Sequence, residues 1–484
     1  MDAALSKLDA QFARDGMNEP QDASQRNAEI ADSAAPPLLG RWRSRRGGAL
    51  RGVARAPGDK SISHRALILG ALAEGETDIV GLLQSDDVLR TAAAMRALGA
   101  RIERDGRGED ARWRVSGAAW RAPGQPLYFG NSGTGCRLVM GAVAGQGVTA
   151  AFDGDASLRA RPMRRIADPL ELMGARIEME DGRLPLTVSV SDAGLTGVAY
   201  ELPVASAQVK SAALLAGLGA SGETVIQEST LTRDHTERML TAFGIALDIE
   251  TAGTGRRIRL AGGQTLSPAS INVAGDPSSA AFPIVAALIT PDSDVCIRNV
   301  LMNPARIGLY QTLREMGADL EVEDERTVSG EPVADMRARH SALKGVAVPA
   351  SRAPSMIDEY PILAVAAAFA DGDVYMPGIE ELRVKETDRI DAVVAMLKAA
   401  GVETEAGPDF LRVMSATSGS KGGAPKGGAR VETRHDHRIA MSALVLGLGA
   451  DEPVEIDDAS MIATSFPDFA VLMRSLGADL APSA

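Results

Sequence analysis

One pattern constrains the fold of this chain more than any other, because it occurs six times. Each copy is the end of an amphipathic helix, then a glycine, then residues that alternate between apolar and polar, as in "AMRALGARIE" (94–103). Glycine suits that place because it adopts the left-handed conformation that ends many helices. The six glycines recur at intervals of 70 to 84 residues: Gly99, Gly174, Gly244, Gly317, Gly401 and Gly477. Such a unit is longer than the common solenoid repeats and has room for about two helices and several strands.

The length of the chain predicts two domains. With 484 residues, it exceeds the size that one hydrophobic core normally organises. Six α/β units then divide most simply into two domains of three units each. Residues 1–48 are Ala-rich and polar, without sustained periodicity, and their acidic residues are atypical of a transit peptide. We expect this segment to be a disordered extension outside the fold.

The charge and the cysteine content argue against several classes of protein. A formal net charge of -13 disfavours nucleic acid or an anionic membrane surface as the main partner. No apolar run approaches the roughly 20 residues of a membrane-spanning helix. Cys136 and Cys296 are the two cysteines, too few for a disulfide scaffold, which fits a reducing cytoplasm. An anionic ligand therefore needs a local basic pocket in an acidic molecule.

Positive charge gathers where one apolar helix is predicted to begin. The segment "GDKSISHRALILGAL" (58–72) places Lys60, Ser61 and Arg65 in the first turns. The unpaired N–H groups and the dipole of a helix already make its N-terminus positive, so additional cations are unfavourable there unless an anion joins them. The segment is a candidate phosphate or carboxylate site. A solvated, charged helix start is the alternative.

Two more segments in the first half of the chain are candidates for anion binding. "FGNSGTGCRLVMG" (129–141) is a glycine-rich turn that contains Gly133, and the basic loop after it carries Arg161 directly before a proline. Further along, Ser206 and Gln208 lie where another helix of small and apolar residues begins. These two side chains either contact an oxygen-rich ligand or only cap the helix.

The second half of the chain combines acidic and basic residues at the edges of apolar helices. "APSMIDEYPILAVAAAF" places Asp358 directly before such a helix. In "LRVKETDRIDAVVAML", Lys385 and Arg389 are four residues apart, with Glu386 beside Lys385. Like charges on one helical face repel each other slightly. An anion bound between the two cations explains this arrangement better than an accident of the surface.

A metal site is the alternative for the last of these segments. "HDHRIAMSALVLGLG" begins with His435, Asp436, His437 and Arg438 before an apolar helix. The chain has five histidines and neither an HExxH nor a CxxC partner for this cluster. We therefore favour a role of Arg438 in anion binding and predict no metal.

Together these segments closely resemble the EPSP synthase family, in particular its bacterial class II branch. The matching stretches extend from about residue 56 to the end of the chain and occur in the family's order. They are "PGDKSISHRA", "GNSGTGCRL", "RPM", "ASAQVKSA", "TRDHTE", "DPSSAAFP", "APSMIDEYPILA", "LRVKETDR" and "DHRIAMS". The related transferase that acts on UDP-N-acetylglucosamine is a poorer match, because it typically has Lys-Asn at the positions of Lys60 and Ser61 and a reactive cysteine before its "RP".

The resemblance implies a fold and an activity. The fold would be an inside-out α/β barrel of two similar domains, each with three βαβαββ repeats, over 58–272 and over 49–57 with 273–484. The enzyme would transfer the enolpyruvyl group of phosphoenolpyruvate to the 5-hydroxyl of shikimate 3-phosphate and release phosphate. It would use no metal or organic cofactor. We expect a cytoplasmic monomer whose partners are these small molecules, with no nucleic acid and no membrane.

The resemblance also implies roles for residues of this chain. Contacts to shikimate 3-phosphate match Lys60, Ser61, Arg65, Ser206, Ala207, Gln208, Arg233 and Lys385. Contacts to phosphoenolpyruvate match Lys60, Gly133, Arg161, Arg389 and Arg438. The catalytic group matches Lys60, Asp358, which accepts the 5-hydroxyl proton, and Glu386, which protonates the methylene carbon.

Three positions distinguish this chain from parts of that family. Ala207 stands where class I members usually carry a serine, and Thr464 where they present a lysine to phosphoenolpyruvate. Some class II members have alanine at the position of Gly133, and its methyl group crowds the herbicide glyphosate. The resemblance therefore implies that this chain lacks that obstruction to glyphosate.

Overall fold

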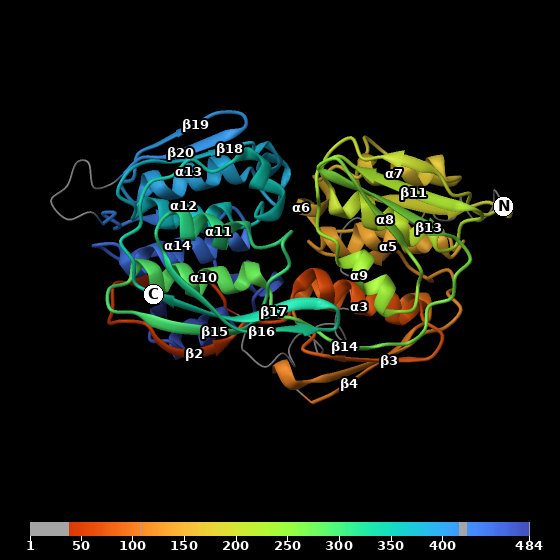
Figure 1. Cartoon of the computed structure of the whole chain (residues 1–484), viewed down its shortest axis with the longest axis horizontal. Coiled ribbons are helices and arrows are strands. Elements are labelled where there is room, and N and C mark those ends of the chain that lie inside the picture. The colour runs from red at the N-terminus through yellow and green to blue at the C-terminus, as the bar shows by residue number, and fades with distance from the viewer. Residues whose placement is uncertain (1–37, 107, 416–423, 484) are drawn as a thin grey trace.

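The buried apolar side chains form two clusters that divide the chain into two domains. The computed structural model describes residues 38–106, 108–415 and 424–483. One cluster extends from Ile62 to Ala274 and also includes Leu301 and Val333, and the other combines Leu38–Ala56 with residues from Ala280 to Leu480. Figure 1 shows the two lobes side by side, and we name them the first and the second domain. The predicted α/β fold of two similar domains is confirmed.

The first domain contains three sheets with one common arrangement. In each, a short strand lies parallel to its neighbour and two antiparallel strands follow, giving the orders β14-β3-β5-β4, β6-β7-β9-β8 and β10-β11-β13-β12. The strands are β3 (Glu76–Val80), β4 (Arg101–Asp105), β5 (Arg112–Ser116), β6 (Leu127–Tyr128), β7 (Ala150–Asp153), β8 (Ala175–Met179), β9 (Leu186–Val190), β10 (Ala199–Glu201), β11 (Glu223–Glu228), β12 (Asp248–Ala252), β13 (Gly255–Ala261) and β14 (Ser270–Asn272). The α-helices are α3 (Lys60–Leu72), α4 (Asp86–Leu98), α5 (Gly133–Gly145), α6 (Ala156–Arg159), α7 (Arg164–Leu172), α8 (Ala207–Gly217) and α9 (His235–Ala242).

The second domain repeats this arrangement with strands from both ends of the chain. Its sheets have the orders β16-β17-β15-β2, β18-β20-β19 and β21-β22-β1-β23. In the three-stranded sheet, a parallel bridge from Ala347 to Tyr375 takes the place of the fourth strand. The strands are β1 (Trp42–Arg45), β2 (Arg51–Arg55), β15 (Asp294–Leu301), β16 (Asp319–Val328), β17 (Glu331–Arg339), β18 (Val374–Pro377), β19 (Thr404–Ala406), β20 (Phe410–Val413), β21 (Arg430–Val431), β22 (Val454–Ile456) and β23 (Asp479–Pro482). The α-helices are α10 (Pro277–Ile289), α11 (Gly308–Glu315), α12 (Tyr360–Ala368), α13 (Arg389–Ala399), α14 (His437–Gly449) and α15 (Phe469–Ser475).

The six glycines of the sequence repeat all follow the second helix of a unit and precede its third strand. Their φ angles lie between 80° and 120°, in the region that favours glycine over residues with a side chain. The six-fold repeat read from the sequence therefore corresponds to six structural units. Each unit buries one helix almost completely, as in α10, where every residue is buried.

Strand β1 corrects the expected boundary of the N-terminal extension. We expected residues 1–48 to lie outside the fold, yet β1 pairs with β22 on one side and β23 on the other. Trp42 and Ser44 are buried and the arginines between and after them are exposed. With one large apolar residue in four, this strand has too little apolar periodicity to be recognised from the sequence. Residues 1–37 lie outside the described residues.

The chain passes between the domains twice, and the two crossovers pair with each other. The N–H of Asp59 donates to the carbonyl of Ala274, and the N–H of Asp276 donates to the carbonyl of Pro57, both at 2.7 Å. A side chain at Gly58 would lie 2.0 Å from the carbonyl oxygen of Gly81, so the close approach requires glycine. Both crossovers end in an aspartate that caps a helix, Asp59 for α3 and Asp276 for α10.

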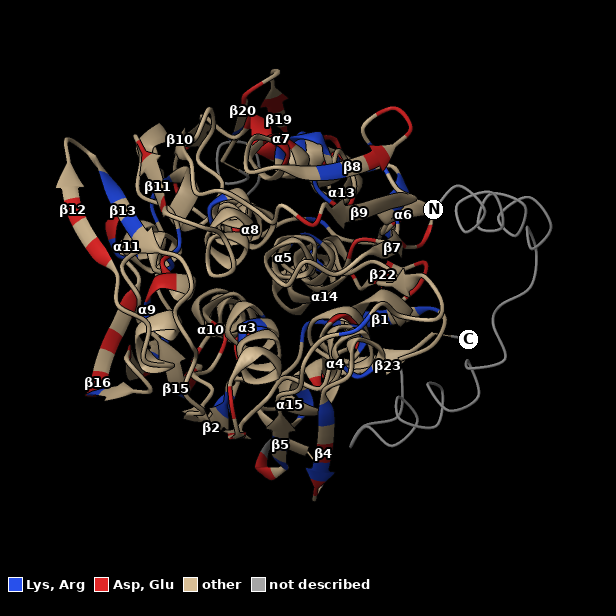
Figure 2. Ribbon diagram, turned by 90° about the vertical axis from the view of Figure 1, so that its right-hand side faces the viewer, with Lys and Arg blue, Asp and Glu red and all other residues tan. Residues whose placement is uncertain are grey.

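Charged residues lie mainly on the outer strands. Figure 2 shows acidic residues along β12 and β16, whereas the central helices α5, α8, α10 and α14 are largely uncharged. Charged side chains that are buried inside the molecule are therefore expected to have hydrogen-bonded or oppositely charged partners. Within the described residues, no helix has both the length and the apolar character needed to cross a bilayer.

The role of β1 in the second domain leads to a prediction for Trp42. The Trp42 side chain is 6% exposed and its ring lies 4.8 Å from the guanidinium carbon of Arg474. Trp42→Ala should lower the free energy of unfolding by about 3 kcal/mol, measured by urea denaturation followed by circular dichroism. The matched control is Leu39→Ala, because Leu39 is 68% exposed, and a change within about 0.5 kcal/mol is expected there. Equal effects of both variants would contradict the role assigned to β1.

Candidate active site

Several of the predicted site residues lie at the N-terminal ends of helices. Lys60, Gly133, Ala207 and Arg389 are the first residues of α3, α5, α8 and α13, and Arg438 is the second residue of α14. The first N–H groups of a helix have no intrahelical acceptor and carry the positive end of the helix dipole. The fold therefore directs helix N-termini as well as cationic side chains toward the same region.

Glu386 is the point at which arginines from both domains meet. Its carboxylate lies 2.6 Å from Arg389 of the second domain and 3.6 Å from Arg161 of the first. The Oγ of Ser157 donates to the Glu386 carbonyl at 3.4 Å, also across the domains. These contacts place α6 and the turn before α13 face to face.

Asp358 forms a second contact between the domains. Arg233 of the first domain donates to one oxygen of Asp358 at 2.5 Å, and Arg389 lies 3.4 Å from the other. Arg389 therefore bridges Asp358 and Glu386, the two carboxylates that the sequence singled out. Lys385 and Arg438 are close enough to lower the pKa of Asp358. Four cations thus surround this one carboxylate.

Both carboxylates are held in the charged form. Burial alone raises the pKa of Glu386, but Arg389 and then Arg161 outweigh it, so that the pKa lies well below the usual range. Burial likewise raises the pKa of Asp358, and Arg233, Arg438 and Lys385 bring it well below its usual value. Opposite charges stabilise the ionised form more than desolvation disfavours it. At neutral pH the domain interface therefore contains two partly buried carboxylates, both ionised, with side chains that are each 17% exposed.

Arg389 is held in place by a third carboxylate. Its side chain is 1% exposed, and its Nε donates to Asp436 at 2.7 Å. Asp436 in turn caps α14 by accepting from the N–H of Arg438 at 2.9 Å. Asp436 is thus committed to an arginine and a helix cap, which leaves the metal interpretation of His435–Asp436–His437 without support. No group of three or more His, Cys, Asp or Glu side chains suited to a metal occurs in the part of the chain that the structure describes.

Lys60 lies beside these charges, held by an acidic residue of α4. Its ammonium forms an ion pair with Asp87, whose side chain is 4% exposed. Burial raises the pKa of Asp87, although Lys60 opposes the shift. Lys60 is also close enough to lower the pKa of Glu386 and of His437. The structure therefore brings Lys60 together with residues of the second domain.

The glycine-rich turn lies against two arginines. A Cβ on Gly133 would be 3.0 Å from the Arg161 guanidinium and 3.2 Å from that of Arg137. Arg161 is also bonded to Asn131 of the same turn. Glycine at the start of α5 thus leaves room for both guanidinium groups beside its N–H groups.

The residues predicted to bind the sugar phosphate have fewer contacts with one another than the charged residues around Asp358 and Glu386. Gln208 accepts from Arg137 at 2.8 Å and donates to Thr134 at 3.0 Å, which ties α8 to the glycine-rich turn. Ser206 caps α8 by accepting from Val209 at 3.4 Å, as the capping alternative expected. Ser61 presents its side chain on the first turn of α3, and Ala207 contributes only its backbone.

Arg65, which is expected to contact substrate, is held in place by the first domain. Its guanidinium donates to Thr236 and Ser211, both at 2.7 Å, and to the carbonyl of Ser61 at 2.9 Å. Burial lowers the pKa of Arg65 to about 10. Arg65 is thus anchored among hydroxyl groups of the first domain and supports the turn that carries Ser61.

The structure adds residues that sequence reasoning did not select. Asp87 and Asn131 contact Lys60 and Arg161, but an acid in the first helical turn and an asparagine beside glycines are common anywhere. His437 is buried, and burial, followed by Arg438 and Lys60, keeps its pKa well below the usual value. Its Nδ1 lies 3.3 Å from the hydroxyl of Thr464. A neutral polar pair therefore occupies the position where class I members were expected to present a lysine.

The burial of Arg389 leads to a prediction about stability. Arg389→Met would leave Asp358, Glu386 and Asp436 without their shared partner, so the free energy of unfolding should fall by about 3–5 kcal/mol. The control is Arg164→Met, because Arg164 is 52% exposed and pairs with two carboxylates on the surface of α7. A loss below about 1 kcal/mol is expected for this variant. Denaturant titration of both variants measures the difference, and similar losses would contradict the proposed charge balance.

Comparisons with known proteins agree with this geometry. The EPSP synthase (3-phosphoshikimate 1-carboxyvinyltransferase) family model matches residues 44–473. A 3-phosphoshikimate 1-carboxyvinyltransferase of Phenylobacterium zucineum is 58% identical over 439 residues, covering 90% of this chain and 95% of that protein. One of Afipia carboxidovorans is 59% identical over 435 residues, covering 89% and 96%.

Solved structures lead to the same family. EPSP synthase from Acinetobacter baumannii superposes with a TM-score of 0.80 and 42% identity, over 92% of this chain and 100% of that one. The enolpyruvyl transferase NikO from Streptomyces tendae shares the fold, with a TM-score of 0.70 at 20% identity, over 93% and 99%. The family match, the relatives and the solved structures lead to one conclusion: the chain belongs to the EPSP synthase family, the 3-phosphoshikimate 1-carboxyvinyltransferases.

Proposed function

We propose that the cleft between the domains binds shikimate 3-phosphate and phosphoenolpyruvate and joins them, with the residue roles given below. As a member of its family, the chain is a carboxyvinyltransferase of the shikimate pathway that acts on small molecules. The assignment of individual residues rests on one observation. Cations from both domains meet at Asp358 and Glu386: Lys60, Arg161, Arg233, Lys385, Arg389 and Arg438.

The charge of the cleft suits two phosphorylated acids. Two such anions repel each other strongly where water is excluded, and unit charges 4 Å apart interact with about 4 kcal/mol at an effective dielectric near 20. Arg161, Arg389, Arg438 and Gly133 surround the position we assign to phosphoenolpyruvate. Lys60 lies between the two substrates. The N-termini of α3, α5 and α8 add N–H donors for phosphate oxygens.

The sugar phosphate is assigned to the first domain and to Lys385. Its phosphate and ring hydroxyls contact Ser61, Ser206, Gln208 and the backbone at Ala207. Arg65 donates to the carbonyl of Ser61 and so supports the turn that carries this serine. Arg233 reaches the same substrate once it no longer pairs with Asp358.

The two carboxylates carry opposite proton transfers. The ionised Asp358 accepts the proton of the 5-hydroxyl while the oxygen attacks C2 of phosphoenolpyruvate, and Glu386 donates a proton to C3. In the elimination, the ionised Glu386 takes a proton from C3, the C2–O bond to phosphate breaks, and the leaving phosphate accepts the proton held by Asp358, which yields the enol ether. Glu386 starts with a pKa well below the usual range. Substrate anions that neutralise Arg161 and Arg389 raise this pKa and so allow Glu386 to become the acid.

The activity is tested by mixing the purified protein with both substrates. Stoichiometric release of phosphate and the vinyl proton signals of an enol ether in the NMR spectrum are expected. Shikimate without its phosphate should react far more slowly, because it lacks the group that the helix N-termini bind. UDP-N-acetylglucosamine as the acceptor should give no product. Turnover of that nucleotide sugar, or none with shikimate 3-phosphate, would overturn the proposal.

Arg161 is predicted to stabilise charge that develops on phosphoenolpyruvate. Arg161→Ala should lower kcat/KM about 100- to 1000-fold, as does the loss of a charge-stabilising donor in other enzymes. Arg159→Ala is the matched control, because Arg159 lies two residues away, is 52% exposed and pairs with Asp153. A change below about threefold is expected for that variant. Comparable losses in both would show that the loop, and not Arg161 itself, is required.

A further inference from the structure

A buried arginine joins the two chain crossovers. Arg306 follows β15 in the second domain, and its side chain is 2% exposed. One terminal nitrogen lies 2.8 Å from Asp59, and the other lies 3.3 Å from Asp276. These are the aspartates that cap α3 of the first domain and α10 of the second. One guanidinium therefore links a helix N-terminus in each domain at the place where the chain passes between them.

The same aspartates are coupled to the backbone of Lys60. Asp59 accepts from the N–H of Ile62 at 2.8 Å, which orients the first turn of α3. Asp276, which belongs to the second domain, accepts from the N–H of Lys60 itself at 3.3 Å. The second domain thus supplies part of the cap for the helix that presents Lys60. A shift of the Arg306 guanidinium moves both carboxylates and, through them, this turn.

Arg306 also connects to the acidic pair at the start of α12. It donates to the hydroxyl of Ser278 at 3.0 Å, and that hydroxyl donates to Glu359. Glu359, which is 2% exposed, is the neighbour of Asp358 in the sequence. The chain of contacts therefore extends from Lys60 to the backbone that presents Asp358.

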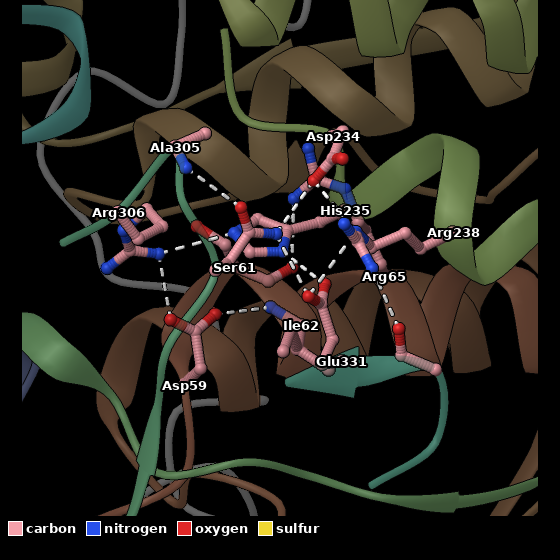
Figure 3. A network of polar contacts seen from close by, with 12 residues as sticks. Asp59, Ser61, Ile62, Arg65, Asp234, His235, Arg238, Ala305, Arg306 and Glu331 are labelled. Carbon is pink, nitrogen blue, oxygen red and sulfur yellow. Dashed lines mark hydrogen bonds and ion pairs between the residues drawn. The ribbon is translucent and has the colours of Figure 1, made fainter. Parts of the chain in front are cut away.

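Residues of both domains complete the network around Arg306. Figure 3 shows Arg306 between Asp59 and His235, with Glu331 on the far side of His235. The Nε2 of His235 lies 3.4 Å from Arg306, and the Nδ1 lies 2.7 Å from Glu331. Asn303 donates to Glu331 at 2.9 Å and to Asp234 at 2.7 Å. These neighbours leave Arg306 little freedom to move.

We propose that Arg306 is a positioning residue for the transfer reaction: it fixes Lys60 relative to Asp358 by tying the caps of α3 and α10 together. This inference rests on the proposed function. Arg306 acts through other residues, because its side chain is 2% exposed and its guanidinium contacts Asp59, Asp276 and Ser278. A planar guanidinium spans two carboxylates and a hydroxyl at once, whereas the ammonium of a lysine is a single point charge on a flexible stem.

The test compares Arg306→Lys and Arg306→Met with the unaltered enzyme. A displacement of about 1 Å at reacting groups can lower a rate about 100-fold. We expect kcat to fall about 10- to 100-fold in Arg306→Lys and further in Arg306→Met, while KM for each substrate stays within about threefold. Rates are measured well below the unfolding midpoint of each variant. The matched control is Arg337→Lys, because Arg337 forms a forked pair with Asp294 on the surface of β17, and its kcat should not change.

The measurements distinguish an Arg306 that positions reacting groups from an Arg306 that only stabilises the fold. A lower unfolding midpoint with kcat within threefold of the unaltered enzyme would overturn the inference, as would a tenfold rise in KM at unchanged kcat. If Arg306→Met fails to fold because Asp59 and Asp276 lose their partner, Arg306→Lys decides alone. An unaltered enzyme without activity would contradict the proposed function instead, so the two failures are distinguishable.

Discussion

The structure depends on a balance of buried charge at the meeting of its two domains. An unpaired charge in a protein interior is costly, and several of the cations here have acidic counterparts, as Arg389 has Asp358, Glu386 and Asp436. Several of these pairs join different domains, including Arg233 with Asp358 and Arg161 with Glu386. The charges that would bind substrates therefore also hold the domains against each other.

The six-fold repeat explains how such a cleft arises. A unit of this fold buries one helix almost entirely and begins it at the same end of its sheet, so several N-termini face one region. Three of the six begin with a residue used in the proposed site: Lys60 on α3, Gly133 on α5 and Ala207 on α8. The repeat thus supplies a common positive background, because each helix N-terminus carries partial positive charge. Side chains that differ between the units then provide the specificity.

The sequence predicted those parts of the fold and site that are encoded locally. Gly317 and its counterparts end helices through their own conformational freedom, so the repeat was visible without a structure. Asp358 and Glu386 were conspicuous because Asp358 directly precedes an apolar helix and Glu386 lies beside Lys385. Strand β1 was missed because it is stabilised by partners more than 400 residues away, Ile456 and Pro482. Asp87 and Arg306 were missed for the same reason, since a single acid or arginine acquires meaning only from its distant neighbours.

Arg65 and Arg306 illustrate why residue type alone does not determine a role. Both are arginines buried in the first and second domain respectively, and sequence reasoning assigned Arg65 to substrate. Three of its five N–H groups donate to Thr236, Ser211 and the carbonyl of Ser61, which orients the guanidinium, and its contact with substrate stays a prediction. Arg161, by contrast, keeps a longer contact of 3.6 Å to Glu386, which substrate anions replace at little cost. A cation preorganised in this way needs little rearrangement during the reaction, and this is the condition under which buried electrostatics accelerate chemistry most effectively.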